Sequence, residues 1–250
     1  MSVKTILVSQ PKPTSEKSPY FDLAEKYNVK IDFRQFINVI GVTSREFRAQ
    51  KIELGLHNSV ILTSKTSVDH FFRIAEEMRY KVPESTKYFC MSEAVAYYLQ
   101  KYVVYRKRKI FFGKQNIDDL MPLLLKHKKE RFLLPCSNIL RKRIPDALKE
   151  NNLNFTEAVL YKTVAADLSD LKDVKYDLLV FFSPSGIESL FKNFPKFKQN
   201  GTKIAAFGPT TANAVKKNNL RLDIHAPLPK YPSMSMAIEN YIKAEKKKKS

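Results

Sequence analysis

Short apolar segments alternate with helix-like segments along this chain of 250 residues. The apolar segments are rich in Val, Ile, Leu and Phe without strict alternation with polar residues, as is typical of strands buried on both faces of a parallel sheet. We predict strands at Thr5–Ser9, Ser59–Thr63, Lys87–Met91, Lys109–Phe112, Arg131–Pro135, Leu178–Phe182, Lys203–Phe207 and Asp223–Ala226. We predict helices at Val68–Arg79, Glu93–Tyr102, Ile117–His127, Ile139–Asn151, Ile187–Phe194, Thr211–Asn218 and Met234–Ala244. Strands that alternate with helices in this way predict an α/β fold.

An internal repeat divides this fold into two related parts. One pair of similar segments aligns Ser64 with Ser183, and a second pair follows it at nearly the same distance in both copies. The first pair is Val60–Phe72 with Leu179–Phe191, and the second is Lys87–Ala96 with Lys203–Ala212. Two copies of one strand–helix pattern predict two lobes, each with a parallel sheet flanked by helices.

The order of the repeat predicts that one lobe is inserted into the other. A third, weaker pair joins Phe132–Ser137 to Ile6–Pro11, so a segment near the start of the chain corresponds to a late segment of its middle part. We therefore predict a discontinuous lobe A, formed by residues 1–38 and 166–250, and an inserted lobe B, formed by residues 43–154.

Two segments cross between the predicted lobes, residues 30–42 and residues 156–165. Both alternate apolar and polar side chains, as strands with one solvated face do. We expect the two segments to pair as a two-stranded β-ladder. Such a ladder would join the lobes as a hinge and let them move relative to each other.

The chain is strongly basic, with a formal net charge of +19, of which the four lysines of Lys246–Lys249 supply a small part. A basic surface attracts polyanions, which leaves nucleic acid, anionic lipid and a polycarboxylate metabolite as candidate ligands. The basic stretches Tyr105–Lys109 and Lys126–Arg131 lack the base-stacking aromatic pattern of an RNA-binding sheet. We interpret them as solvated surface and expect no nucleic-acid partner.

The sequence contains no motif typical of a metal site or of a nucleotide cofactor. Cys90 and Cys136 lack the spacing of a zinc site, and two distant cysteines do not make a disulfide scaffold. No apolar run reaches the roughly 18–20 residues that a membrane helix needs, and the apolar part of the N-terminus is too short for a signal peptide. We therefore expect a cytoplasmic protein without a cofactor, a metal or a membrane partner.

Two turns that contain glycine follow predicted strands of lobe A. Phe182–Gly186 and Phe207–Ala212 each place hydroxyl side chains and a glycine between the end of a strand and the start of a helix. Backbone N–H groups at a helix N-terminus form an anion site, and ligands of open α/β sheets bind at the carboxyl ends of the strands. Helix capping is the alternative explanation of each turn. Two such turns at one sheet edge favour a binding site, with the candidate residues Ser183, Ser185, Gly186, Thr210 and Thr211.

Tyr161 is the candidate residue of the second crossing segment, within Val159–Val164. A tyrosine on a hinge strand can point into a cleft between the lobes. A packed strand aromatic is the alternative, because the chain has twelve tyrosines.

In order along the chain, FFSPSGIESLF, IAAFGPTTANAV and APLPKYPSM resemble the C-terminal half of the uroporphyrinogen-III synthases. LLPCSNILRKRIPDALKENN followed by VLYKTV resembles their central segment. The resemblance implies two α/β lobes joined by a β-ladder, with one lobe discontinuous. It also implies a cyclising hydro-lyase of haem biosynthesis, which closes hydroxymethylbilane into uroporphyrinogen III with inversion of ring D and loss of water. This substrate carries an acetate and a propionate on each pyrrole, which gives the basic charge a purpose.

The resemblance also implies roles for single residues. Tyr161 matches a family tyrosine that assists departure of the substrate hydroxyl, Thr211 matches a supporting threonine, and Lys203 matches a carboxylate partner. The backbone around the serine and glycine residues of lobe A would hold substrate carboxylates. We also expect a monomer, with transient handover of substrate from hydroxymethylbilane synthase.

Lobe B departs from the family pattern at several turns. Lys65 replaces a frequent proline, and Cys136 with Ser137 replaces a frequent Arg-Gly pair. We expect Ser64, Thr66 and Ser92 to supply the lost donors, and Arg141 is a further match. These departures support an alternative of another class, a non-catalytic protein that binds a polyanion such as nucleic acid.

Overall fold

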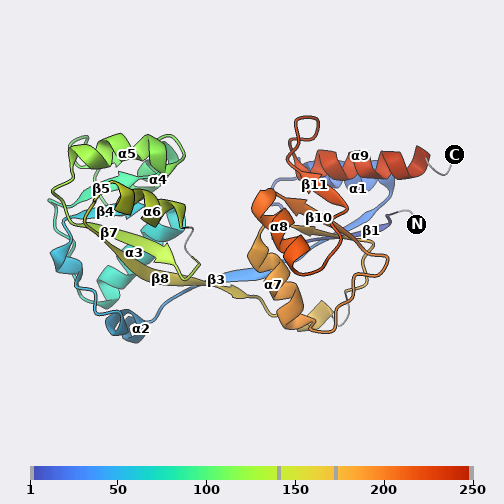
Figure 1. Ribbon diagram of the computed structural model, residues 1–250, viewed down its shortest axis with the longest axis horizontal. Helices are drawn as coiled ribbons and strands as arrows, with labels where there is room; N and C mark the ends of the chain where they lie inside the picture. The colour runs from blue at the N-terminus through green and yellow to red at the C-terminus, as the bar shows by residue number, and fades with distance from the viewer. Residues whose placement is uncertain (1–2, 140–141, 172–173, 248–250) are drawn as a thin grey trace. The chain divides into compact units, whose positions relative to one another are not determined.

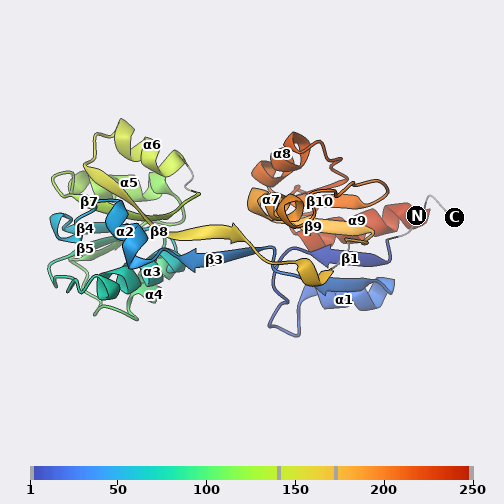
Figure 2. The same ribbon diagram turned by 90° about the horizontal axis from the view of Figure 1, so that it is seen from below.

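The computed structural model describes residues 3–139, 142–171 and 174–247, and strands alternate with helices through most of them (Figure 1). The chain divides into two units. The first unit is formed by Met1–Asn38 and Val164–Ser250, and the second unit by Val39–Thr163. Each unit is an α/β structure with helices on both faces of its own sheet (Figures 1 and 2). The predicted fold class is confirmed.

The sheet of the first unit is parallel and has the strand order β11-β10-β9-β1-β2. Alternate residues of each strand enter different cores. Leu178 and Val180 pack with helices α1 and α9, whereas Leu179 and Phe181 pack with α7 and α8. The strands are β1 Thr5–Val8, β2 Lys30–Phe33, β9 Leu178–Phe181, β10 Lys203–Phe207 and β11 Ile224–Ala226, and the helices are α1 Pro19–Tyr27, α7 Pro184–Asn193, α8 Pro209–Lys217 and α9 Met234–Lys247, with a 3₁₀ turn at Ser169–Leu171.

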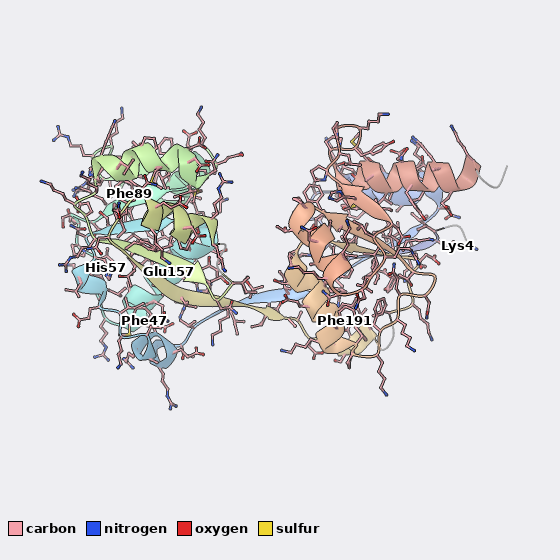
Figure 3. All side chains as sticks on the ribbon, viewed as in Figure 1. Lys4, Phe47, His57, Phe89, Glu157 and Phe191 are labelled. Atoms are coloured by element: carbon pink, nitrogen blue, oxygen red, sulfur yellow. The ribbon has the colours of Figure 1, made fainter. Side chains whose placement is uncertain are left out.

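The sheet of the second unit has the strand order β3-β8-β7-β4-β5-β6, and β4 to β8 are parallel. Its two faces also carry separate cores. Phe47 belongs to the core under α2, α3 and α4, and Phe89 to the core under α5 and α6 (Figure 3). The strands are β3 Ile37–Gly41, β4 Ser59–Leu62, β5 Lys87–Cys90, β6 Ile110–Phe112, β7 Phe132–Ser137 and β8 Phe155–Ala165, and the helices are α2 Ser44–Ala49, α3 Lys65–Glu77, α4 Glu93–Leu99, α5 Ile117–Lys126 and α6 Arg143–Glu150, with a 3₁₀ turn at Leu54–Leu56.

The two sheets repeat one topology. The order β6-β5-β4-β7-β8 of the second unit corresponds strand by strand to β11-β10-β9-β1-β2 of the first. In this correspondence β7 matches β1, which is the third and weakest segment pair of the sequence. The sheet order therefore agrees with a repeat whose order is changed in one copy by insertion of the second unit into the first.

The strands β3 and β8 are neighbours, and the boundary between the units falls inside both. At one end the N–H of Val42 donates to the carbonyl of Leu160 at 3.0 Å, and at the other the N–H of Ala166 donates to the carbonyl of Phe36 at 2.9 Å. These bonds fit one antiparallel register, the pattern of a two-stranded ladder.

The prediction that residues 30–42 form one hinge strand is wrong in its first part. Lys30–Phe33 is β2, which pairs in parallel with β1 at the edge of the first sheet. Its alternating side chains result from this edge position, where one face is covered and the other is solvated. The crossing strand starts later, at Ile37.

The helices α1 and α2 were not predicted. Their N-termini have local signals: α1 starts with Pro19, and α2 follows Thr43, whose side chain forms a capping box with Glu46. Helix α1 carries Tyr20, Leu23 and Tyr27 at helical spacing on one core, whereas α2 is short and buries Phe47 alone. Among the helices of the described residues, none has the length and apolar character to cross a bilayer.

Candidate active site

The first candidate turn lies at the carboxyl end of β9, where Ser183 caps helix α7. The Ser183 Oγ accepts a hydrogen bond from the N–H of Gly186 at 3.3 Å. Pro184 has no N–H, so the first N–H group of the helix belongs to Ser185. The helix supplies no acceptor for this group. The turn is thus a true helix cap, and it also offers an N–H group and a hydroxyl where the macrodipole is positive.

The second candidate turn lies at the carboxyl end of the neighbouring strand β10. Gly208 has a φ of +82°, which glycine adopts without strain, and Pro209 opens helix α8. Thr210 is exposed and Thr211 is 1% exposed. The Thr211 Oγ1 is buried without a hydrogen-bond partner among the described residues. Two helix N-termini therefore stand side by side at one edge of the first sheet.

Ser9 was missed from the sequence and completes this edge. It follows β1, and a Cβ placed on Gly186 would lie 3.7 Å from the Ser9 Oγ. The strand order changes direction between β1 and β9, the point where α/β sheets bind ligands. The weak similarity of Ile6–Pro11 to Phe132–Ser137 was the signal that could have indicated this serine.

Lys203 does not lie with these residues. It is the first residue of β10, whereas the candidate turn follows the last, so the two ends of the strand are about 13 Å apart. The Lys203 Nζ lies 3.9 Å from the Oδ1 of Asp223. Lys203 is therefore not part of the group formed by the candidate turns, because a residue that starts a strand lies at the opposite sheet edge from them, and its role as a substrate ligand stays a prediction.

The corresponding edge of the second unit carries three of the predicted donors. Ser64 caps helix α3 and accepts a hydrogen bond from the N–H of Ser67 at 3.1 Å, so it repeats the geometry of Ser183. Thr66 lies in the first turn of α3. Ser92 caps α4 at the end of β5, and its side chain makes no capping hydrogen bond. The Ser92 hydroxyl is thus not used to hold its own helix.

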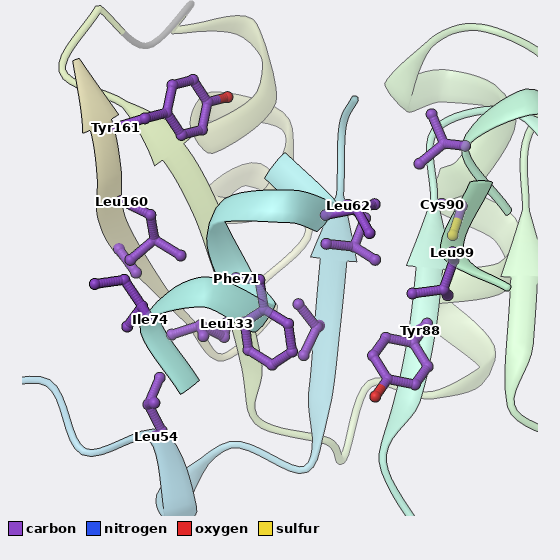
Figure 4. Packing of buried hydrophobic residues seen from close by; sticks show 14 of the residues in the cluster. Leu54, Leu62, Phe71, Ile74, Tyr88, Cys90, Leu99, Leu133, Leu160 and Tyr161 are labelled. Atoms are coloured by element: carbon purple, nitrogen blue, oxygen red, sulfur yellow. The ribbon is translucent and has the colours of Figure 1, made fainter. Parts of the chain in front are cut away.

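Tyr161 lies on β8 opposite Ser137, the last residue of β7, and therefore near the same edge. Its side chain is 9% exposed and packs at one side of the α2–α4 core beside Leu160 (Figure 4). Burial raises the pKa of the Tyr161 hydroxyl above its usual value, while hydrogen bonds with Ser64 and Thr63 lower it. The phenol is protonated at neutral pH and can act as a hydrogen-bond donor.

His70 contacts this tyrosine and was also missed. Its ring stacks on the Tyr161 ring with centroids 5.0 Å apart and an interplanar angle of 19°. Burial lowers the pKa of His70, as does the nearby Arg73, while Asp69 raises it. One turn of α3 separates His70 from Ser67, but no sequence pattern linked it to a tyrosine 91 positions later in the chain.

Arg141 lies outside the described residues. The remaining candidates separate into one group in each unit: Ser183, Ser185, Gly186, Thr210 and Thr211 with Ser9 in the first, and Tyr161, Ser64, Thr66 and Ser92 with His70 in the second. The second unit has a hollow of about 620 Å³ that opens near the amino ends of β5 and β6. None of the candidate residues lines this hollow. Among the described residues, no three His, Cys, Asp or Glu side chains group in a way that could hold a metal ion.

Comparison with known proteins gives a consistent assignment. The family model for uroporphyrinogen-III synthase HemD matches residues 35–235. The uroporphyrinogen-III synthase of Chlorobaculum parvum is 25% identical over 259 aligned positions, which cover 96% of this chain and all of that protein.

Solved structures agree on the fold. Uroporphyrinogen-III synthetase from Helicobacter pylori matches with a TM-score of 0.61 at 18% identity, covering 96% of this chain and 99% of that one. A mutant uroporphyrinogen III synthase from Thermus thermophilus matches with a TM-score of 0.55 at 15% identity, covering 98% and 99%. Because the family model spans most of the sequence, the chain belongs to the uroporphyrinogen-III synthase family.

Proposed function

We propose that this protein cyclises hydroxymethylbilane to uroporphyrinogen III, with inversion of ring D and loss of water. The observation that carries the proposal is the family match over residues 35–235, together with hydroxyl-bearing helix N-termini at the carboxyl edges of both sheets. The family match favours this enzyme over a non-catalytic protein that binds a polyanion.

The reaction needs orientation more than strong acids or bases. Loss of the substrate hydroxyl leaves an electrophilic azafulvene, which the distant pyrrole attacks through its substituted carbon to give a spiro intermediate. Rearrangement of this intermediate closes ring D in inverted orientation. Since the substrate is itself reactive, holding it in a near-attack conformer and selecting the attacking carbon supply most of the control.

We assign Tyr161 as the residue that assists departure of the hydroxyl. A phenol that keeps its proton can donate to the leaving oxygen as that oxygen gains negative charge. Burial holds the pKa of Tyr161 above its usual value, which supports a donor role. Ser64 and Thr63 contact the same hydroxyl and orient it.

The helix N-termini would bind the carboxylates of the substrate. In the first unit the N–H groups of Ser185, Thr210 and Thr211 lie in the first turns of α7 and α8, where the helix supplies no acceptor. The positive end of the helix dipole favours an anion at each of these places. Thr66 and Ser92 would play the same part in the second unit.

Product analysis tests this function directly. The purified protein is supplied with hydroxymethylbilane, and the uroporphyrinogen isomers are separated after oxidation to porphyrins. We expect type III product, because only an enzyme prevents the uninverted closure that occurs spontaneously. Type I product alone, as in the reaction without protein, would refute the function.

The setting of the reaction is part of the same proposal. We propose a cytoplasmic monomer that needs no cofactor and receives its substrate from hydroxymethylbilane synthase by transient contact. The protein is treated with a chelator, dialysed and passed over a size-exclusion column. Type III formation by the fraction that elutes as a monomer would support this view. Dependence on an added metal would contradict it.

A further inference from the structure

The ring of His70 lies flat against the ring of Tyr161. The two side chains come from different elements, His70 from α3 and Tyr161 from β8, and their centroids are 5.0 Å apart. Ser64, the cap of the same helix α3, contacts the Tyr161 hydroxyl. Helix α3 therefore holds the phenol at two places, at its face and at its oxygen.

Arg73 fixes the ring of His70. The Arg73 Nε donates a hydrogen bond to the His70 Nδ1 at 3.1 Å, so this nitrogen is the acceptor and the imidazole is neutral. The same guanidinium donates to the carbonyl of Leu160 at 3.0 Å, the residue before Tyr161, and pairs with Glu77. One arginine thus connects the histidine ring to the backbone beside the tyrosine.

Gly41 makes room for this arginine. A Cβ at position 41 would lie 2.7 Å from both Cζ and Nη2 of Arg73, closer than any side chain tolerates. The guanidinium therefore lies against β3, at a point where that strand carries no side chain. The arrangement includes residues of α3, β3 and β8, which is more than a surface contact requires.

We propose that His70 is a positioning residue for Tyr161, and that Arg73 holds His70 in its neutral form against the phenol. This inference rests on the role proposed above for Tyr161. A flat ring on one face and a hydroxyl contact at the oxygen leave the phenol little freedom. Small errors in the placement of a catalytic group are costly in rate, so a fixed phenol raises kcat.

Protonation of His70 would dismantle this arrangement. A proton on Nδ1 removes the acceptor for Arg73 and places two cations side by side. The charged groups that act on His70 are Arg73 and Asp69 of its own helix, and Tyr161 faces it from β8. Burial and Arg73 lower the pKa of His70, so the neutral form dominates at pH 7 and is lost only in more acidic solution.

An NMR titration tests the contact without substrate. Tyrosine and histidine rings are labelled with ¹³C, and the signals of Tyr161 and His70 are identified by their loss in Tyr161→Phe and His70→Phe. We expect the Tyr161 signals to follow the titration of His70, with a midpoint below the ordinary histidine value. Tyr161 signals that ignore this titration would overturn the inference, whatever the activity of the protein.

Kinetics of type III formation test the consequence. We expect His70→Ala to lower kcat about fivefold or more, with KM changed less than about twofold, because stacking energy and orientation are lost together. His70→Phe keeps a flat ring but cannot titrate. It should restore most of kcat and remove the acidic decline of kcat that we expect of the wild type.

His127 provides the matched control. It is a half-buried histidine of the same unit, it contacts the rings of Phe89 and Phe111, and burial lowers its pKa as well. His127→Ala should leave kcat unchanged. Equal losses in His70→Ala and His127→Ala, or an unaltered kcat in His70→Ala, would overturn the positioning role. A wild type that forms no type III product would instead refute the proposed function and leave the NMR result standing.

Discussion

At the scale of single residues, the environment of Tyr161 combines burial with contacts to its oxygen. Burial favours the protonated phenol, whereas the hydroxyls of Ser64 and Thr63 accept or donate at the oxygen and moderate this effect. The balance leaves a donor whose position is fixed but whose proton remains available. A tyrosine that only filled the core would not need two hydroxyl partners at the rim of the sheet.

Removing the Tyr161 hydroxyl should therefore affect turnover more than stability. We expect Tyr161→Phe to lower kcat for type III formation at least about fivefold, and to change the free energy of unfolding by no more than about 1.5 kcal/mol, the range for one hydrogen bond. Steady-state kinetics and urea unfolding measure the two effects. Tyr88→Phe is the control, since Tyr88 is another buried tyrosine of the second unit with a pKa raised by burial. Wild-type kcat in Tyr161→Phe would remove this residue from the mechanism.

Gly41 permits a second test that changes no candidate residue. In Gly41→Ala the added methyl group collides with the guanidinium, so Arg73 must shift, and we expect the shift to break its contacts with His70 and Leu160. We expect kcat to fall to the level of Arg73→Met, and the double variant to fall no further, because both changes remove the same interaction. Gly55→Ala serves as the control, since its methyl group would meet only Tyr80, at an ordinary 3.8 Å. Additive losses in the double variant would contradict this coupling.

At the scale of elements, the helix caps of the two units perform a structural task that any α/β protein needs. Ser183 and Ser64 each accept a hydrogen bond from the third residue of their helices. Thr43 does the same at α2 in a reciprocal capping box. Capping alone therefore does not identify a site, and a test must separate lost stability from lost binding.

Ser183→Ala and Thr43→Ala allow this separation. Both should lower the free energy of unfolding by about 1 kcal/mol, as the loss of an N-cap hydroxyl does. Only Ser183→Ala should raise KM for hydroxymethylbilane, because Ser183 caps a helix whose N-terminus we propose as a carboxylate site. Thermal unfolding and initial-rate kinetics at several substrate concentrations measure the pair. An equal rise of KM in both variants would show that KM reports stability and not binding.

The strands were predictable because their signal is local and strong. Each is a short run of large apolar residues followed by a turn, and burial on both faces allows hardly any other structure. Helix α1 carries Tyr20, Leu23 and Tyr27 at helical spacing, so its pattern was also present in the sequence, whereas α2 buries Phe47 alone and depends on its capping box. Lys30–Phe33 was assigned to the wrong element because an edge strand and a hinge strand have the same alternating pattern.

The candidate site was predictable where it depends on position in a strand–helix pair. Ser183, Ser64 and Thr211 follow strands, and the end of a parallel strand fixes the sheet edge on which they lie. By the same rule Lys203 does not lie with these residues, because it starts its strand. His70 was out of reach, since its contact with Tyr161 depends on how α3 packs against β8, and a single sequence does not encode that contact as a pattern.

At the scale of the whole molecule, a duplicated unit accounts for the unusual path of the chain. Both sheets have one strand order, although the copies begin at different strands. The second unit is continuous, whereas the first is assembled from both ends of the chain. Each unit buries separate cores on the two faces of its own sheet. Such cores give each unit what it needs to fold alone.

The antiparallel ladder indicates where the chain can be rejoined. Hydrogen bonds pair Phe36 with Ala166 and Val42 with Leu160, and the register between them places Asn38 opposite Val164. Residues opposite each other in such a ladder have Cα atoms about 4.5–5.5 Å apart, a distance that a two-residue Asn-Gly turn closes. We expect a chain of residues 1–38, Asn-Gly and 164–250 to fold as the first unit, and residues 39–163 to fold as the second.

Circular dichroism and cooperative thermal unfolding of the two fragments measure this independence. Both fragments should unfold cooperatively, and neither should form type III product, because the first unit lacks Tyr161 and the second unit lacks the proposed carboxylate sites at α7 and α8. The matched control joins the chain two residues earlier, from Phe36 to residue 164, which breaks the register of the ladder and should lower the thermal midpoint. A first-unit fragment that stays unfolded with the Asn-Gly turn would show that the units fold only together. Type III synthesis by either fragment would show that the reaction needs the residues of one unit alone.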